Sequence, residues 1–154
     1  MNGIIIYGTF HGSTKECAEK LAKLTNFSII DAKTALNMDF SSYDKIIIGS
    51  ALQKFRVHPD IEKLFNTKKA SFTPEKTYFF QVSTNPKLPK YFQPNLQNIK
   101  SAHFGGKIDW ATLNFSERII ISIISFLCKT NLKNFNNIQE ARIKKFAAEV
   151  INSK

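Results

Sequence analysis

The stretch Ile4-Ile5-Ile6-Tyr7-Gly8-Thr9-Phe10-His11-Gly12-Ser13-Thr14-Lys15 is the most informative part of this sequence of 154 residues. A short apolar run leads into a turn rich in hydroxyls and glycines. Apolar residues then recur at helical spacing, at Cys17, Leu21 and Leu24. This order predicts a strand, a turn and a helix over Thr14–Leu24, and the start of a helix attracts phosphate. The sequence therefore predicts a phosphate-binding turn, with an ordinary turn capped by Ser13 as the alternative.

The glycine spacing excludes two common types of phosphate-binding loop. Gly8 and Gly12 enclose three residues, so neither the P-loop spacing nor the dinucleotide pattern G-x-G-x-x-G is met. The turn resembles the T-x-T-G-x-T loop of flavodoxins, because Thr9, Gly12 and Thr14 match and His11 replaces the middle threonine. This resemblance implies that the turn wraps the phosphate of FMN. The implied binding residues are Thr9, Phe10, His11, Gly12, Ser13 and Thr14.

Apolar, β-rich runs alternate with helical patterns along the rest of the chain. Strands are expected at Ile4–Tyr7, Phe27–Ile30, Lys45–Ile48, Thr77–Val82 and Ala102 to about Ile108. Further helices are expected at Pro59–Phe65, after His58, and at Ile138–Ile151, with Ile143, Phe146, Ala147, Val150 and Ile151 facing inward. Unbroken runs such as Ile46–Ile48 are typical of strands covered on both faces. We predict a single α/β domain over 1–154, a flavodoxin-like doubly wound five-stranded parallel sheet with helices on both faces.

Two further loops follow strands at the edge of the sheet where the phosphate turn is expected. Ligands of doubly wound sheets bind at this edge, beyond the carboxyl ends of the strands. The resemblance to flavodoxins implies that these loops hold the isoalloxazine ring of FMN. Their residues are Ser50, Ala51, Leu52 and Gln53 after the third strand, and Ser83, Thr84 and Asn85 after the fourth.

A block in the second half of the chain supports a narrower resemblance. It is similar to the F-G-G-x-[LI]-D-[YW]…D-R pattern of the protoporphyrinogen IX dehydrogenase branch of the flavodoxin superfamily. The matching residues are Phe104, Gly105, Gly106, Ile108, Asp109, Trp110 and Arg118, with Glu117 in place of the usual Asp. The resemblance implies an FMN-dependent oxidoreductase that takes hydride equivalents from a tetrapyrrole substrate and passes electrons to a quinone.

Two other functions remain open on the sequence alone. One is a flavodoxin-type electron-transfer protein or quinone reductase of another pathway, and the other is a flavodoxin-like interaction domain without cofactor. The net charge of +10 departs from the acidic character of electron-shuttling flavodoxins. Such charge attracts an anionic membrane or an acidic substrate, unless it is only a solvated surface. The lysines are scattered and form no recognition motif, so no nucleic-acid partner is expected.

We identify no catalytic acid or base and no metal-binding pattern among the remaining polar residues. Cys17 and Cys128 lie far apart in sequence, which is typical of a reducing cytosol and not of a disulfide scaffold or zinc site. The default role of Cys17 is that of a small buried hydrophobe. No signal peptide is visible before the first strand. We therefore expect a cytoplasmic protein. Among the histidines, His11 is the first to mutate, because it lies in the predicted phosphate loop.

An apolar helical insertion is predicted at about 110–130, and Arg118–Lys129 is its unusual part. On a helix Arg118, Ser122, Ser125 and Lys129 form one narrow polar stripe, and apolar side chains cover the rest. The stretch is far shorter than the ~20 residues that span a bilayer. It is either buried within the fold or a dimer, or it lies in a membrane interface. We predict peripheral contact with the inner face of the cell membrane, where a quinone acceptor would be reached.

Overall fold

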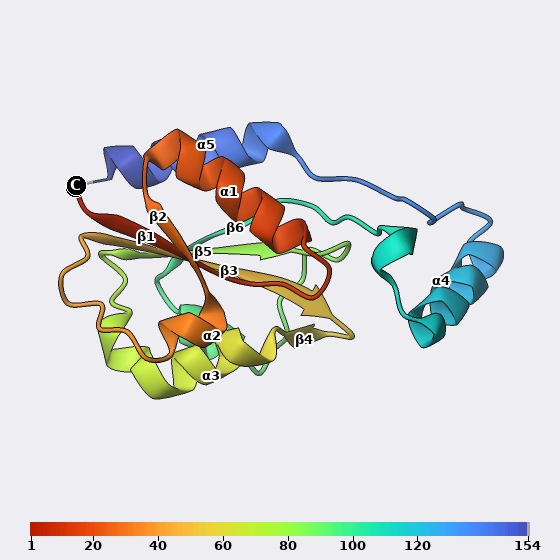
Figure 1. Ribbon diagram of the computed structural model, residues 1–154, viewed down its shortest axis with the longest axis horizontal. Helices are drawn as coiled ribbons and strands as arrows, with labels where there is room; N and C mark the ends of the chain where they lie inside the picture. The colour runs from red at the N-terminus through yellow and green to blue at the C-terminus, as the bar shows by residue number, and fades with distance from the viewer. Residues whose placement is uncertain (154) are drawn as a thin grey trace.

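A parallel sheet forms the centre of the computed structural model, which describes residues 1–153 (Figure 1). Its parallel strands run in the order β2-β1-β3-β5-β6. They are β1 (Gly3–Gly8), β2 (Ser28–Asp31), β3 (Lys45–Gln53), β5 (Thr77–Val82) and β6 (Lys100–His103). A two-residue strand, β4 (Arg56–Val57), pairs antiparallel with the end of β3. The predicted five-stranded parallel sheet is confirmed, and β4 is an addition to it.

Helices cover both faces of this sheet (Figure 1). One face carries α1 (Ser13–Thr25) and α5 (Glu140–Asn152), and the other carries α2 (Ala32–Ala35) and α3 (Pro59–Lys68). Within β1, Ile5 packs on the α1 and α5 side, whereas Ile4 and Ile6 pack on the α2 and α3 side. Strands buried on both faces explain the unbroken apolar runs. Short 3-10 turns occupy Lys69–Ser71, Gln93–Leu96 and Trp110–Thr112.

The last strand and the last helix differ in detail from the prediction. β6 runs from Lys100 to His103, so the expected strand from Ala102 to about Ile108 began two residues late and was wrong from Phe104 onward. Gly105 has a φ of +90°, a left-handed conformation that interrupts a strand. In α5 the predicted inward residues are buried except Ile151, which is 40% exposed. That residue lies in the last turn of the helix, beyond the stripe that faces the sheet.

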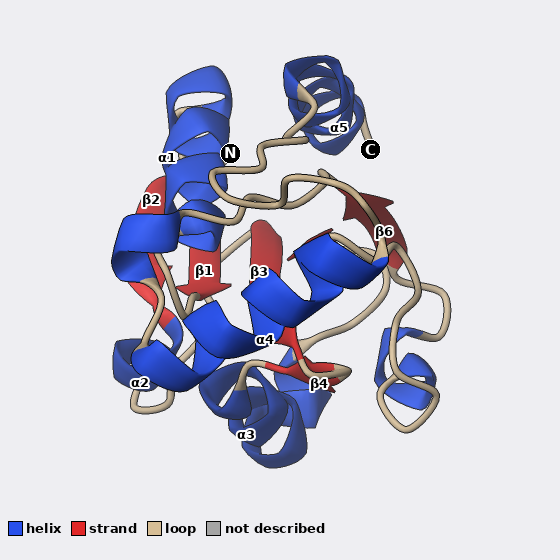
Figure 2. Ribbon diagram, turned by 90° about the vertical axis from the view of Figure 1, so that its right-hand side faces the viewer, coloured by secondary structure: helices blue, strands red, loops and turns tan. Residues whose placement is uncertain are grey.

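Helix α4 (Phe115–Leu127) lies apart from the sheet, beyond the carboxyl end of β3 (Figures 1 and 2). It is the apolar helix predicted within 110–130. None of the thirteen residues of α4, all of which the structure describes, is buried. The interpretation of this helix as buried within the fold is therefore wrong for the single chain. Among residues 1–153, no helix is long and apolar enough to cross a membrane.

Candidate cofactor site

A cavity of about 570 Å³ lies at the carboxyl ends of β1, β3 and β5, and α4 crosses in front of it (Figure 2). Its walls come from the loops at these strand ends, from the segment after β6 and from one side of α4. This is the edge at which doubly wound sheets bind ligands. The cavity is therefore the candidate functional site.

The loop between β1 and α1 is closed by its own first residue. The backbone N–H of Gly12 donates to Thr9 Oγ1 over 2.9 Å. Gly12 is the N-cap of α1 and has a φ of +86°, which glycine adopts without strain. The alternative of Ser13 as the N-cap is wrong, because Ser13 is the first helical residue. The loop residues that line the cavity are Thr9, Phe10, His11, Ser13 and Thr14, whereas Gly12 shapes the loop.

Thr14 places a buried hydroxyl without a partner at this loop. Its side chain is fully buried in the first turn of α1, and its Oγ1 finds no hydrogen-bond partner among residues 1–153. Buried hydroxyls are nearly always paired, and Oγ1 of Thr77, which does not line the cavity, lacks a partner among these residues in the same way. The first N–H groups of a helix also lack intrahelical acceptors, and the helix dipole favours an anion beside them. The residues present therefore fit a phosphate group.

His58 contacts the phosphate loop from the α3 side. Its ring centroid lies 4.6 Å from that of Phe10, and a Cβ on Gly8 would come within 2.8 Å of it. Its Nδ1 accepts from the backbone N–H of Asp60 over 3.3 Å, which makes His58 the N-cap of α3. Its predicted role at the start of this helix is confirmed. Burial lowers the pKa of His58 despite the nearby Asp60 carboxylate, so the ring is neutral at neutral pH.

β3 continues past its predicted end at Ile48 and turns into a hairpin with β4. Ala51, Leu52 and Gln53 therefore line the cavity from a strand rather than from a loop. Ser50 differs from the expectation for a binding residue, because it is fully buried behind the cavity wall. Its Oγ accepts from the backbone N–H of His58 over 3.1 Å and donates to the carbonyl of Ala51 over 2.8 Å. That hydroxyl is thus used within the protein.

The loop after β5 is held by the segment that follows β6. The backbone N–H of Ser83 donates to the carbonyl of Gly105 over 2.9 Å, and His103 Nε2 lies 2.8 Å from the carbonyl oxygen of Ser83. A Cβ on Gly106 would come within 2.5 Å of the Ser83–Thr84 backbone, so only glycine allows this approach. The loop residues that line the cavity are Ser83, Thr84 and Asn85.

Packing accounts for the first three residues of the F-G-G block. Phe104 is fully buried, and its ring stacks on Phe80 with the centroids 4.9 Å apart. Gly105 has its positive φ where a Cβ would lie 1.8 Å from the carbonyl oxygen of Asn137. The block also supplies cavity residues that the sequence did not single out as binding residues, namely Gly106, Lys107, Ile108 and Asp109.

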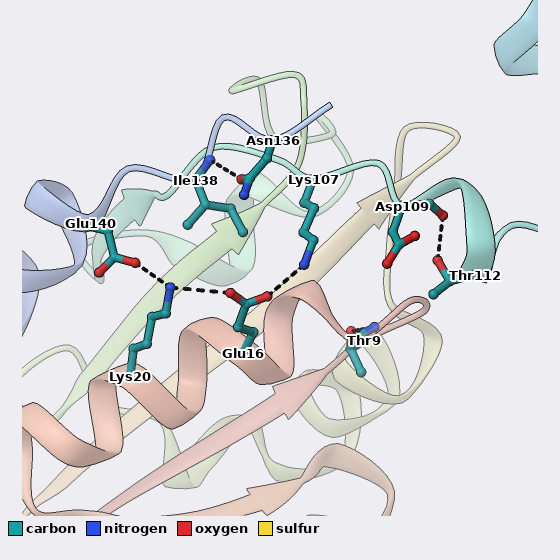
Figure 3. A network of polar contacts seen from close by, with 10 residues as sticks. Thr9, Glu16, Lys20, Lys107, Asp109, Thr112, Asn136, Ile138 and Glu140 are labelled. Carbon is teal, nitrogen blue, oxygen red and sulfur yellow. Dashed lines mark hydrogen bonds and ion pairs between the residues drawn. The ribbon is translucent and has the colours of Figure 1, made fainter. Parts of the chain in front are cut away.

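Four charged side chains form a row that ties this wall of the cavity to α1 and α5 (Figure 3). Lys107 Nζ lies 3.2 Å from Glu16 Oε2, and the other carboxylate oxygen of Glu16 lies 3.4 Å from Lys20 Nζ. Lys20 also pairs with Glu140 of α5. Burial raises the pKa of Glu16, but Lys107 and Lys20 outweigh it and the net pKa is lowered. Each partly exposed pair contributes little alone, so the row chiefly fixes where Lys107 lies.

One face of α4, together with the residue that precedes its N-cap, forms the outer wall of the cavity, and the sequence did not identify these residues as part of the site. Their spacing of three and four residues places these side chains on one side of the helix. They are Leu113, Glu117, Ile120, Ile121 and Ile124. Periodicity could not select them, because apolar residues surround most of this helix.

Glu117 fixes the start of α4 to two loops of the cavity. Its Oε1 accepts from the side-chain amide of Gln53 and lies 3.4 Å from His11 Nε2. Its Oε2 accepts from the backbone N–H of Asn114 over 2.9 Å, which completes a capping box. Burial raises the pKa of Glu117, but the bonds from Asn114 and Gln53 and the nearby His11 outweigh it and lower the net pKa. The Asn114-x-x-Glu117 spacing is the sequence signal that could have identified this cap.

The two cysteines differ in their exposure. Cys17 is fully buried, and burial raises its pKa to about 12, so its predicted role as a small hydrophobe is confirmed. Cys128 is exposed at the end of α4. Within residues 1–153, no three His, Cys, Asp or Glu side chains are grouped as a metal site requires.

Comparison with known proteins identifies the family of the chain and solved structures with a similar fold. The model of the flavodoxin domain family matches residues 4–133, and no curated protein matches the chain. Oxidised Flavodoxin 1 from Bacillus cereus is similar with a TM-score of 0.60 at 17% identity, over 100% of this chain and 99% of its own.

Two larger proteins share the fold over part of their length. The Flv1 flavodiiron core from Synechocystis sp. PCC6803 has a TM-score of 0.57 at 13% identity over 68% of this chain. Rubredoxin oxygen:oxidoreductase from Desulfovibrio gigas has a TM-score of 0.53 at 11% identity over 98% of this chain. The chain spans 30% and 37% of these two proteins. At such identities the likenesses establish the fold alone.

Proposed function

Because the chain belongs to the flavodoxin domain family, we propose that it binds FMN noncovalently in the cavity beside α4. The observation that carries this proposal is the cavity at the start of α1, which is lined by Thr9, Ser13 and Thr14. Thr9, Ser13 and Thr14 would hold the phosphate together with the first N–H groups of α1. When bound, FMN supplies the redox chemistry, and the protein supplies binding, orientation and electrostatics.

The remaining walls fit the flavin ring by their chemistry. Ligand sites combine mainly apolar walls with a few placed polar groups. Leu52, Val82 and Ile108 provide apolar surface, and the ends of β3 and β5 provide backbone groups beside them. The segments Ala51–Gln53 and Ser83–Asn85 would therefore hold the ring.

The first test of this proposal is cofactor binding. We expect the purified protein to be yellow and to bind one FMN per chain in calorimetric titration. Riboflavin, which lacks the phosphate, should bind at least tenfold more weakly, because each charge-assisted hydrogen bond contributes about 1.5–3 kcal/mol. A colourless protein that binds no added FMN would contradict the proposal and favour a cofactor-free interaction domain.

We further propose an oxidoreductase that oxidises a tetrapyrrole and passes the electrons to a quinone. Lys54, Lys87 and Lys107 line the cavity and would attract the carboxylates of such a substrate. Ile120, Ile121 and Ile124 of α4 would pack on its apolar ring system. The net charge of +10 favours the same class of anionic substrate.

A flavodoxin-type electron-transfer protein or quinone reductase of another pathway is the second candidate. It rests on the fold alone, which the chain shares with Flavodoxin 1 from Bacillus cereus over nearly the full length of both chains. The two candidates differ in their reaction partners. The first oxidises a small anionic substrate, whereas a carrier exchanges electrons with another redox protein.

Anaerobic turnover with protoporphyrinogen IX and a water-soluble quinone separates these candidates. We expect porphyrin fluorescence to appear as the quinone takes up the electrons and protons removed from the porphyrinogen. The double variant Lys54→Gln/Lys87→Gln should raise KM several-fold, because two cations beside the cavity are lost. Lys144→Gln/Lys145→Gln on α5 removes the same charge elsewhere and should leave KM unchanged. Rapid exchange with a ferredoxin-type partner and no porphyrin formation would favour the carrier.

A further inference from the structure

Helix α4 has two different apolar sides. One side lines the cavity through Glu117, Ile120, Ile121 and Ile124. The opposite side, here called the outer face, consists of Phe115, Ile119, Ile123, Phe126 and Leu127. Each of these residues lies three or four positions from another member of the set, and Leu127 follows Ile123 by four. This spacing places them together on the helix surface. Glu117 holds the helix to the body of the protein, so the outer face points away from the cavity.

The outer face is exposed along the whole helix. Its five side chains are between 46% and 82% exposed. Phe10 of the phosphate loop and Phe55 at the tip of the β3–β4 hairpin are also exposed, and both line the adjoining cavity. Folded monomers rarely expose a contiguous apolar patch of this kind unless it is an interaction surface.

A tryptophan and three cations, Arg118, Lys129 and Lys133, lie within α4 or close to its ends in sequence. The ring centroid of Trp110 lies 5.8 Å from the guanidinium of Arg118 and 4.7 Å from the ammonium of Lys133. Lys129 follows the last turn of the helix. Tryptophan with lysine and arginine beside an apolar helix face is the composition of segments that lie at the surface of a bilayer.

We propose that the outer face of α4 docks on a lipid bilayer with anionic headgroups, with the helix lying in the plane of the membrane interface. The chain carries a net charge of +10, which attracts an anionic surface and opposes contact between two copies of itself. With thirteen residues α4 is shorter than the ~20 residues of a spanning helix, so it lies on the bilayer. This proposal does not depend on FMN.

The structure changes which residues should contact lipid. From the sequence alone we expect that replacing Ile120 and Ile124 by Ser weakens membrane binding, but in the structure both side chains line the cavity. Arg118 is partly buried, and its guanidinium contacts the carbonyl of Ala111 at 3.5 Å. The polar stripe thus faces the chain itself in part, and the apolar outer face is the surface presented to the bilayer.

Vesicle co-sedimentation tests this proposal on the full chain. Vesicles containing phosphatidylserine should bind the protein at low salt, while pure phosphatidylcholine vesicles and high salt should reduce the bound fraction. Phe126→Ser/Leu127→Ser should lower the partition coefficient at least tenfold, because two large exposed apolar side chains are lost. Leu24→Ser/Ile151→Ser, on α1 and α5, removes two partly exposed apolar side chains outside α4 and should leave it unchanged.

A fluorophore on Cys128 gives a second measurement that does not require Phe126 or Leu127 to be replaced. It therefore remains valid if the double variant folds poorly. Cys128 is exposed beside Leu127, while Cys17 is buried, so one thiol accepts an environment-sensitive fluorophore. Its emission should shift to the blue on vesicles with phosphatidylserine. No sedimentation at low salt, or binding that Phe126→Ser/Leu127→Ser leaves intact, would overturn the proposal. A dimer in light scattering that this variant dissociates would also overturn it and assign the face to a second copy.

Discussion

Replacing Gly105 by alanine is expected to destabilise the protein by about 2–6 kcal/mol, a large part of the stability of a typical domain. The residue has a φ of +90°, which strains any residue with a Cβ. The added Cβ would also lie 1.8 Å from the carbonyl oxygen of Asn137, so the backbone of that segment must move. Urea unfolding of the two proteins measures the difference in free energy of unfolding.

Gly12→Ala is the matched control for this prediction. Gly12 has nearly the same φ, +86°, but a Cβ there would meet no heavy atom within 4 Å in the described part of the chain. Both variants carry the backbone strain, and only Gly105→Ala carries the clash. The difference between them, about 1–3 kcal/mol, therefore measures the contact with Asn137. Equal losses of stability would show that the clash is relieved without cost.

Thr14→Val is expected to weaken FMN binding by about 10-fold to 150-fold, which corresponds to one charge-assisted hydrogen bond. The same variant should stabilise the protein without FMN by about 1 kcal/mol, because it removes a buried hydroxyl that lacks a partner within residues 1–153. Valine has nearly the same shape as threonine, so packing is retained. Calorimetry measures the affinity, and urea unfolding measures the stability. Riboflavin affinity should stay unchanged.

Thr25→Val provides the control within the same helix. Thr25 is also buried, but its Oγ1 donates to the carbonyl of Leu21 over 2.9 Å. Its replacement should therefore destabilise the protein by about 1 kcal/mol and leave FMN affinity unchanged. If Thr14→Val destabilised the protein as Thr25→Val does and left FMN affinity intact, Thr14 would not be a phosphate ligand.

The fold was predictable because its strands are buried on both faces. Runs such as Ile46–Ile48 then contain no polar interruption, and the helices between them show clear apolar stripes. The strand, turn and helix that form the loop after β1 were predictable for a local reason. Its hydroxyls and glycines act within a few residues of one another, so their spacing in sequence determines their arrangement in space.

The rest of the site depends on contacts that sequence spacing does not encode. The turn between β3 and β4 is formed by Lys54 and Phe55 with φ of +49° and +59°, and it lacks the Gly or Asn that normally marks a hairpin. The cavity side of α4 is selected by where Glu117 meets Gln53 and His11, which lie far away in sequence. Binding of FMN by the candidate residues stays a prediction.

The charged row from Lys107 through Glu16 and Lys20 to Glu140 also bears on the order in which the protein is made. The loop after β1 is synthesised before α5, yet the wall that faces it packs on that helix, and Lys20 in the charged row pairs with Glu140 of α5. Phe104 packs on Phe146 of this helix with the ring centroids 5.5 Å apart. A nascent chain that lacks α5 thus has the loop without its completed wall, so the cavity is completed only after the last helix has been made.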